Sequence, residues 1–364
     1  MLPQALPAGT TEGGLLPLTP LEFLYYIGYS LKKRRSCRHR RSLPCTVVSI
    51  GNITVGGTGK TPAAIALAEE ALARGFSPIV LTRGYKGRAK GPCFVLPRQS
   101  GSAEAGRPPS CSSAEDAGDE PMVMAERLAG VPVVKSADRY QGGVFALRHL
   151  AALRPSLRTD APVLFILDDG FQHWKLSRDL DIVLIDGLDP FGSRKMLPLG
   201  PLREPLEALQ RADMVVITKA RNEEAAAEVR AVNPRAAVFF SGYSVRGIRT
   251  KAGGAFPVEM LEDQAVYAFC GLANPESFRQ TVVKLGARLS GFTAYRDHHA
   301  YTPSDIRFLG DEAQQKGCRF LVTTEKDIVK LKGFSLPLPL LCIEIAFIPD
   351  AGFYDALFSR IARS

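Results

Sequence analysis

Short apolar runs alternate along most of this chain with stretches that have the spacing of amphipathic helices. Residues 46–50 (TVVSI) are mostly β-branched, and five later runs have a similar apolar character. Such runs are typical of buried parallel strands, which helices connect. The pattern predicts strands at 46–50, 78–85, 131–134, 163–169, 181–186 and 213–218, with helices at 63–72, 119–128 and 138–153. We therefore predict an α/β fold, a mostly parallel sheet with helices on both faces.

The alternating pattern is interrupted at two places. Residues 90–113 are rich in Gly, Pro and Ser, which indicates an insertion or a mobile loop. Residues 242–258 lack periodic apolar positions, and we interpret them as a break. A second series of elements is predicted after it, at 266–271, from Pro275, and at 289–295, 320–324 and 338–345. We interpret residues 45–241 as the core and 242–364 as a smaller C-terminal α/β lobe.

Residues 1–44 form a separate N-terminal part. Within it, residues 18–31 (LTPLEFLYYIGYSL) begin with Thr19, Pro20 and Glu22, which resembles a helix capping box. The predicted helix is apolar on most sides, but it is too short for a membrane span and carries a carboxylate. Residues 32–41 (KKRRSCRHRR) follow it with seven lysines and arginines.

Three interpretations of this N-terminal segment are open at this point. Aromatic side chains beside a polybasic run suit a helix that lies in the headgroup region of an anionic membrane. The helix could instead pack on the protein's own core, with its basic end in water. Nucleic acid is the weakest interpretation, because no helix-turn-helix, zinc or RNA-binding motif accompanies the charge.

Composition places the chain among ordinary globular proteins. Its 364 residues are 46% hydrophobic and 23% charged, enough to bury a core over about two domains. The net charge of +9 is unevenly spread, with a concentration in residues 32–41. Seven scattered cysteines without a Cys-x-x-Cys pair predict reduced thiols in a cytosolic compartment and argue against a disulfide framework or zinc site.

The stretch from residue 51 to residue 61 (GNITVGGTGKT) has the features of a phosphate-binding loop between a strand and a helix. Its glycines let backbone N–H groups turn towards an anion, Lys60 can reach the β- and γ-phosphates, and the Thr61 hydroxyl can bind Mg²⁺. The usual pattern G-x-x-x-x-G-K-[ST] begins with glycine, and this chain has Thr54 there. That change removes no phosphate-contacting group. We predict a nucleotide site formed by Thr54, Val55, Gly56, Gly57, Thr58, Gly59, Lys60 and Thr61.

Acidic residues follow or precede the predicted elements at places where ligands bind in such sheets. Asp168 and Asp169 end an apolar strand, the position at which nucleotide-binding folds hold a metal-binding aspartate. Asp119 and Glu120 begin a predicted helix, where acids serve either in a site or as simple caps.

Histidines and basic residues complete the set of candidates. In DHHAYT, Asp297 precedes His298 and His299, and a histidine beside a carboxylate can support proton transfer. Phosphate could also be bound by basic residues in loops or at helix starts, namely Arg83, Arg139, Arg203 and Lys326.

Taken together, these motifs resemble one family, the tetraacyldisaccharide 4'-kinases, which are the lipid A 4'-kinases of Gram-negative-type bacteria. The matching stretches occur in family order: SIGNITVGGTGKTP, LTRGYKG, GDEP, DRYQGG, DDGFQH, PLGPLREP, ITK, DHHAYT and TTEKD. They lie within residues 18–331. Family members have threonine or another residue at the position of Thr54, and they begin with a hydrophobic and basic membrane-associating segment.

The resemblance implies a P-loop NTPase-like fold and transfer of the γ-phosphate of ATP to the 4'-hydroxyl of a lipid disaccharide 1-phosphate. It implies ATP and Mg²⁺ as cofactors, an anionic membrane surface as partner, and a peripheral position at the cytoplasmic face of the bacterial inner membrane. Asp119 would take the sugar hydroxyl's proton and His298 would support it. Phosphates or developing charge would be stabilised by Lys60, Arg139 and Arg203. The metal would be held by Thr61, Asp169 and Glu204.

Other classes share parts of this pattern. Partitioning and septum-placement ATPases carry a lysine just before the glycine pair, where this chain has Val55. A regulatory GTPase needs an Asn/Thr-Lys-x-Asp guanine motif, but residues 218–221 (TKAR) lack the aspartate. A non-catalytic membrane-binding protein would leave the acidic residues at the strand ends without a role. The sequence therefore favours the lipid kinase.

Overall fold

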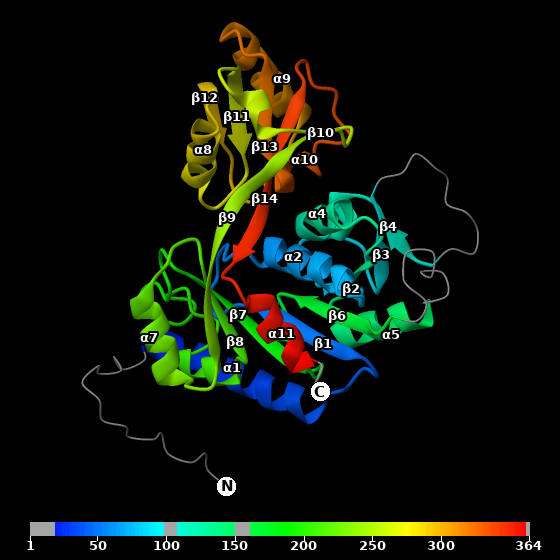
Figure 1. Ribbon diagram of the computed structural model, residues 1–364, viewed down its shortest axis with the longest axis vertical. Helices are drawn as coiled ribbons and strands as arrows, with labels where there is room; N and C mark the ends of the chain where they lie inside the picture. The colour runs from blue at the N-terminus through cyan, green and yellow to red at the C-terminus, as the bar shows by residue number, and fades with distance from the viewer. Residues whose placement is uncertain (1–18, 98–107, 150–160, 362–364) are drawn as a thin grey trace.

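One mixed sheet runs through the whole molecule. The structure is a computed structural model that describes residues 19–97, 108–149 and 161–361. The strand order is β12-β11-β13-β14-β9-β8-β7-β1-β6-β2-β5-β3-β4, with β10 paired to β9. Figure 1 shows two lobes stacked along the long axis, and the long strands β9 (Ala237–Thr250) and β14 (Leu340–Pro349) join them. The predicted α/β architecture is confirmed.

The first lobe contains the predicted core. Its strands are β1 (Thr46–Gly51), β2 (Ser77–Thr82), β3 (Cys93–Val95), β4 (Ser110–Cys111), β5 (Val133–Lys135), β6 (Val163–Asp168), β7 (Leu180–Asp186) and β8 (Met214–Thr218). Its helices are α1 (Pro20–Arg38), α2 (Lys60–Ala73), α3 (Ala114–Ala117), α4 (Asp119–Arg127), α5 (Arg139–Arg148), η1 (Leu206–Arg211), α7 (Glu223–Val232) and α11 (Phe353–Ile361).

The second lobe lies between β9 and β14 in the sequence. Its elements are β10 (Ala255–Phe256), η2 (Val258–Leu261), β11 (Ala265–Cys270), α8 (Pro275–Lys284), β12 (Arg288–Ala294), α9 (Pro303–Gln315), β13 (Phe320–Thr324) and α10 (Glu325–Ile328). The chain then returns along β14, and α11 packs on the first lobe, where Phe358 contacts Phe76.

Successive residues of the central strand β1 point to opposite faces of the sheet, as in any strand. Val48 and Ile50 pack in a cluster with α2, α4 and α11, whereas Val47 packs in a cluster with Ala146 of α5. Strand β1 pairs in parallel with β6 and β7, and its register places Ile50 beside Asp168. The phosphate loop therefore leaves the sheet next to the acidic end of β6.

Three predicted boundaries are wrong in detail. The insertion at 90–113 is not loop throughout, because its described ends form β3 and β4, while residues 98–107 lie outside the described part. The break predicted at residue 242 does not interrupt the strand, since β9 continues to Thr250 and pairs with β14. The strand predicted at 78–85 ends at Thr82. The last residues of the helix predicted at 138–153 lie outside the described part.

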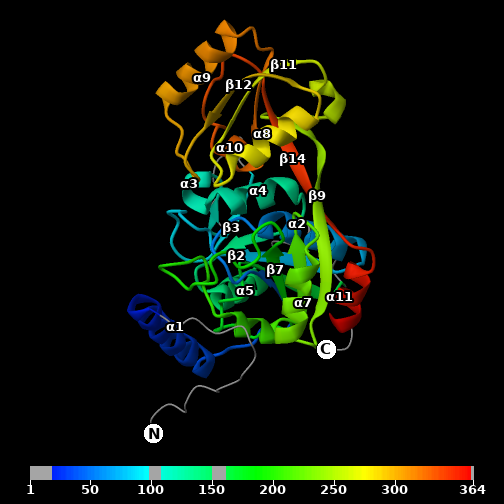
Figure 2. The same ribbon diagram turned by 90° about the vertical axis from the view of Figure 1, so that its left-hand side faces the viewer.

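Helix α1 continues through the basic segment and is 19 residues long. Its predicted capping box is present: the Thr19 N–H donates to Glu22 at 3.0 Å, and the Glu22 N–H donates to the Thr19 hydroxyl at 3.4 Å. Figure 2 shows α1 along the outside of the first lobe, at the end far from the second lobe. Among the described residues, no helix is long and apolar enough to cross a bilayer.

Candidate active site

The phosphate loop connects β1 to α2, and Lys60 is the first residue of that helix. Gly59 has a φ of 84°, which favours glycine, and a Cβ there would lie 1.5 Å from the Tyr243 hydroxyl. Tyr243 comes from β9 and donates to the Thr58 carbonyl at 3.1 Å. Tyr243, from a strand that connects the lobes, therefore fixes the phosphate loop through a hydrogen bond to its backbone.

Thr54 occupies the position where the usual loop pattern has glycine. It forms a bridge with Leu202, and the next N–H, of Val55, donates to the Pro201 carbonyl at 2.7 Å. Thr54 is not among the residues with positive φ. Because the backbone here needs no left-handed conformation, a threonine fits without strain.

The two aspartates at the end of β6 have different environments. Asp168 accepts a hydrogen bond of 2.9 Å from the Thr82 hydroxyl, and burial together with the charge of Asp169 raises its pKa to about 6. Asp169 lies 3.5 Å from the Lys60 ammonium, and Arg203 donates to both its carboxylate oxygens at 3.1 Å. Burial opposes ionisation, but Lys60 and Arg203 hold the pKa of Asp169 below its usual value. Asp169 is thus the carboxylate that faces the cations.

Basic side chains of the site are themselves desolvated. Burial lowers the pKa of Lys60, and it lowers that of Arg139 to about 10. Arg139 is only 4% exposed and donates to the carbonyl of Asp168 at 3.4 Å and to that of Asp169 at 3.5 Å. Cations in a poorly hydrated site attract anions more strongly than they would in water. The arrangement is suited to binding phosphates.

Glu204 is fully buried and has several partners. Its carboxylate accepts from Gln172 at 2.7 Å, from the Tyr29 hydroxyl at 2.8 Å and from Arg211 at 3.1 Å. Tyr29 belongs to α1, so this carboxylate connects the N-terminal helix to the loop that carries Arg203. Both carboxylates are therefore engaged within the protein: Asp169 by two cations, and Glu204 by a hydroxyl, an amide and a guanidinium group.

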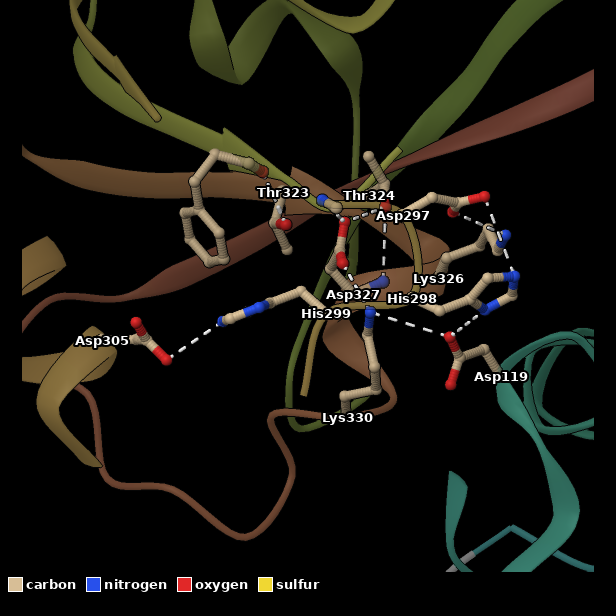
Figure 3. Close-up of polar contacts among 12 residues, drawn as sticks. Asp119, Asp297, His298, His299, Asp305, Thr323, Thr324, Lys326, Asp327 and Lys330 are labelled. Atoms are coloured by element: carbon tan, nitrogen blue, oxygen red, sulfur yellow. Dashed lines mark hydrogen bonds and ion pairs between the residues drawn. The ribbon is translucent and has the colours of Figure 1, made fainter. Parts of the chain in front are cut away.

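A second polar cluster forms where the two lobes meet (Figure 3). Asp119 reaches from the start of α4, and its Oδ2 lies 3.0 Å from Nδ1 of His298 in the loop after β12. Lys330 lies 3.7 Å from the same carboxylate. Glu120 pairs with Lys326 at 2.9 Å, and Lys326 also lies 3.5 Å from Asp297. The predicted GDEP, DHHAYT and TTEKD motifs therefore come together in space.

The neighbouring histidine has another role. His299 Nε2 lies 3.1 Å from Asp305, and its ring stacks on Tyr295 at 4.4 Å between centroids. Asp327 is also structural: it accepts from the Gly271 N–H at 3.0 Å and from the Thr324 hydroxyl at 2.6 Å. Only His298 of the pair faces Asp119.

Both clusters border one cleft of about 1760 Å³. Its walls include the phosphate loop, the end of β6, and residues of the second lobe from Leu272 to Thr281. Among the predicted residues that line it are Lys60, Thr61, Arg83, Glu120, Arg139, Asp169, Arg203, Asp297, His298 and Lys326. Helix α1 contributes Tyr25, Tyr29 and Lys32.

Sequence reasoning missed three contributors. Lys330 lies four residues after Lys326, a helical spacing that could have suggested it. Gln172 is part of the DDGFQH motif and donates to Glu204 as well as to the Asn52 carbonyl. Tyr243 carries no sequence signal, because it meets the phosphate loop only through tertiary structure.

Comparisons with known proteins agree with this geometry. The family model described as "Tetraacyldisaccharide-1-P 4'-kinase" matches residues 15–362. A tetraacyldisaccharide 4'-kinase of Syntrophus aciditrophicus (strain SB) is 38% identical over 327 residues, 85% of this chain and 83% of that protein. Another from Pelobacter propionicus is 37% identical, with 99% and 98% coverage. A crystal structure of LpxK from Aquifex aeolicus in complex with ATP is 31% identical, with a TM-score of 0.71 and coverage of 94% and 97%.

Proposed function

We propose a residue-level mechanism from the premise that this chain belongs to the tetraacyldisaccharide 4'-kinase family and uses ATP to phosphorylate the 4' position of a lipid A precursor. One observation carries the proposal. His298 lines the same cleft as Lys60 of the phosphate loop, and its ring lies 3.0 Å from the Asp119 carboxylate at the lobe junction. Phosphoryl transfer needs a positioned nucleophile and compensated charge more than covalent chemistry.

Lys60 and the backbone N–H groups of residues 56–61 bind the β- and γ-phosphates in this proposal. Lys60 now pairs with Asp169 at 3.5 Å, so the phosphates would compete with that carboxylate for the ammonium group. Arg203 also pairs with Asp169, and Arg139 donates a hydrogen bond to the Asp168 carbonyl at the end of the same strand. In this proposal, the three cations stabilise the negative charge that develops on the transferred group.

The residues present fit Mg²⁺. This ion usually binds one or two carboxylates together with substrate phosphates and water. Thr61 offers a hydroxyl at the start of α2, and the low pKa of Asp169 keeps its carboxylate ionised. When bound, the ion would offset phosphate charge. We assign Thr61 and Asp169 to it, because both line the cleft. Glu204 is not among the lining residues and accepts a hydrogen bond from Tyr29, so we assign it to holding α1.

Asp119 accepts the proton of the 4'-hydroxyl in this mechanism. The ionised carboxylate can only accept hydrogen bonds, so His298 presents its Nδ1–H to Oδ2. This contact fixes the carboxylate, and the Lys330 ammonium lies 3.7 Å from the same oxygen. His298 is therefore a support for the base, and its Nε2 lies 3.8 Å from Glu120 and from Asp297.

We also propose that α1 attaches the enzyme to an anionic membrane at the cytoplasmic face, where ATP is available. One face of α1 packs on the core through Tyr25 and Tyr29, and the other exposes Leu21, Phe23, Leu24, Ile27 and Leu31. The basic run follows on the same helix. Both interpretations of this segment are thus compatible, since a helix can pack with one face and contact lipid with the other.

A phosphate-transfer assay tests the assignment of Asp119. Wild-type protein should move label from [γ-³²P]ATP to a tetraacyldisaccharide 1-phosphate, and Asp119→Asn should lower kcat by about 100-fold or more with little change in the KM for ATP. Asp311→Asn, an exposed aspartate on α9, is the matched control. A wild-type rate in folded Asp119→Asn would refute its role as the base.

A further inference from the structure

The catalytic pair is divided between the lobes. Asp119 belongs to the first lobe, His298 belongs to the second, and the chain passes between the lobes only at β9 and β14 (Figures 1 and 2). The 3.0 Å contact therefore depends on how the lobes are held against each other. Because Asp119 and His298 belong to different lobes, other contacts between the lobes must set their relative position.

Helix α4 is docked on α10 at both ends. Near its start, Glu120 pairs with Lys326 at the rim of the cleft. At its end, Arg127 pairs with Glu325 at 2.7 Å, and these side chains are only 5% and 12% exposed. Seven residues of helix separate the two contacts, about 10 Å along the axis. Two contacts that far apart restrict rotation of α4 as well as its distance from α10.

The Arg127–Glu325 pair is also fixed to a connecting strand. Arg127 donates to the Ile345 carbonyl at 3.4 Å, and the Ile345 N–H donates to Glu325 at 3.1 Å. Ile345 lies in β14. The helix that carries Asp119, the helix that follows β13 and one strand of the connection thus meet at a single point.

A neutral set of charges surrounds this point. Arg249 of β9 lies 2.9 Å from Glu344 of β14 and 3.5 Å from Glu126 of α4. Lys332 lies 2.5 Å from Glu126. The set contains three acids and three bases: Glu126, Glu325, Glu344, Arg127, Arg249 and Lys332. Removing one of these six side chains would leave a poorly hydrated charge without a partner, which is energetically costly. The six side chains therefore hold one another in place.

We infer that Arg127 and Glu325 are positioning residues, which hold α4 against α10 and thereby keep Asp119 within hydrogen-bonding distance of His298. Arg127 is not among the residues that line the cleft, and Glu325, which borders it, has both carboxylate oxygens engaged, one by Arg127 and one by the Ile345 N–H. This inference rests on the proposed role of Asp119. A purely structural role would lower the rate whether or not Asp119 is present. A positioning role predicts that the loss of rate requires Asp119.

The test compares Arg127→Met, Glu325→Gln and the exchange Arg127→Glu/Glu325→Arg. A misplacement of about 1 Å lowers rates by up to roughly 100-fold, so we expect each single variant to lose on the order of 10- to 100-fold in kcat. The KM for ATP should stay near the wild-type value. The exchanged pair should regain much of the rate. The matched control is the exposed ion pair Arg246–Glu69, which joins β9 to α2 and whose exchange should leave kcat unchanged.

A second measurement separates positioning from stability. In an Asp119→Asn background, Arg127→Met should cause little further loss, since both changes remove the same interaction. Urea unfolding of each variant shows that it is folded at the assay temperature, and Glu325→Gln serves if Arg127→Met does not fold. Unchanged kcat in a folded variant, or an equal loss with and without Asp119, would overturn the inference. A wild-type rate in Asp119→Asn alone would instead refute the proposed base.

Discussion

Three leucines on the outer face of α1 provide a quantitative test of membrane attachment. Leu21, Leu24 and Leu31 are 54%, 64% and 61% exposed, respectively. Their spacing of three and seven residues places them on one stripe of the helix. The perturbation is the triple substitution of these leucines by serine, which leaves the basic segment and the half-buried tyrosine face unchanged.

The expected effect follows from the area still exposed. Fully burying a leucine side chain stabilises by about 1.5–3 kcal/mol, and somewhat more than half of each side chain remains available. Each leucine should therefore contribute about 1 kcal/mol to lipid binding. The triple variant should lose about 3 kcal/mol, or roughly 100-fold in partition coefficient.

Vesicle sedimentation measures this loss. Vesicles with anionic lipid are used at low salt and at about 0.5 M salt, where the contribution of the basic segment is largely screened. The control replaces three exposed apolar residues elsewhere, Leu96, Val283 and Phe308, by serine. Equal binding of wild-type and triple variant at high salt, or an equal loss in the control, would refute lipid contact by this face.

Three further predictions concern the site. Lys60→Ala should lower kcat by orders of magnitude in a folded protein, because it removes a cation from the β/γ-phosphates; near-normal turnover would contradict the phosphate-loop assignment. Asp119→Ala and His298→Ala should have strongly non-additive effects on kcat, and fully additive losses would argue against a coupled pair. Burial lowers the pKa of His173 from 6.5 to about 4, so the unfolded chain takes up this proton first as the pH falls. Stability to urea should therefore decline by up to about 3 kcal/mol between pH 6.5 and 4, and His173→Gln should flatten that decline.

The core of the fold was accessible to sequence reasoning because its strands are buried on both faces. Residues of β1, β6, β7 and β8 are almost all buried, so each strand is a continuous apolar run. The phosphate loop was equally clear, since it is a local chain of strand, glycines, lysine and helix. Local signals of this kind need no knowledge of the tertiary structure.

The connection between the lobes was not accessible in the same way. Strand β9 alternates half-buried and exposed positions along much of its length and contains Gly242 and Gly247, so it lacks the apolar run of a core strand. Its strand structure comes from pairing with β14, about one hundred residues later in the sequence. The contact of Asp119 with His298 depends on that pairing, and composition does not reveal it.

Several residues of the cleft have backbone conformations that residues with a side chain rarely adopt. Six non-glycine residues in the described part have positive φ, a conformation that is rare for residues with a side chain. Four of them line the cleft: Lys86, Asp169, Lys219 and His298. Asp169 has a φ of 51° and His298 a φ of 60°, one in each lobe. Because such conformations persist only where surrounding contacts hold them, the ion pairs of Asp169 and the contact of His298 with Asp119 compensate strain as well as place the side chains. An asparagine or a glycine would adopt this backbone more easily, and the roles proposed above for Asp169 and His298 give a chemical reason for a carboxylate and an imidazole at these positions.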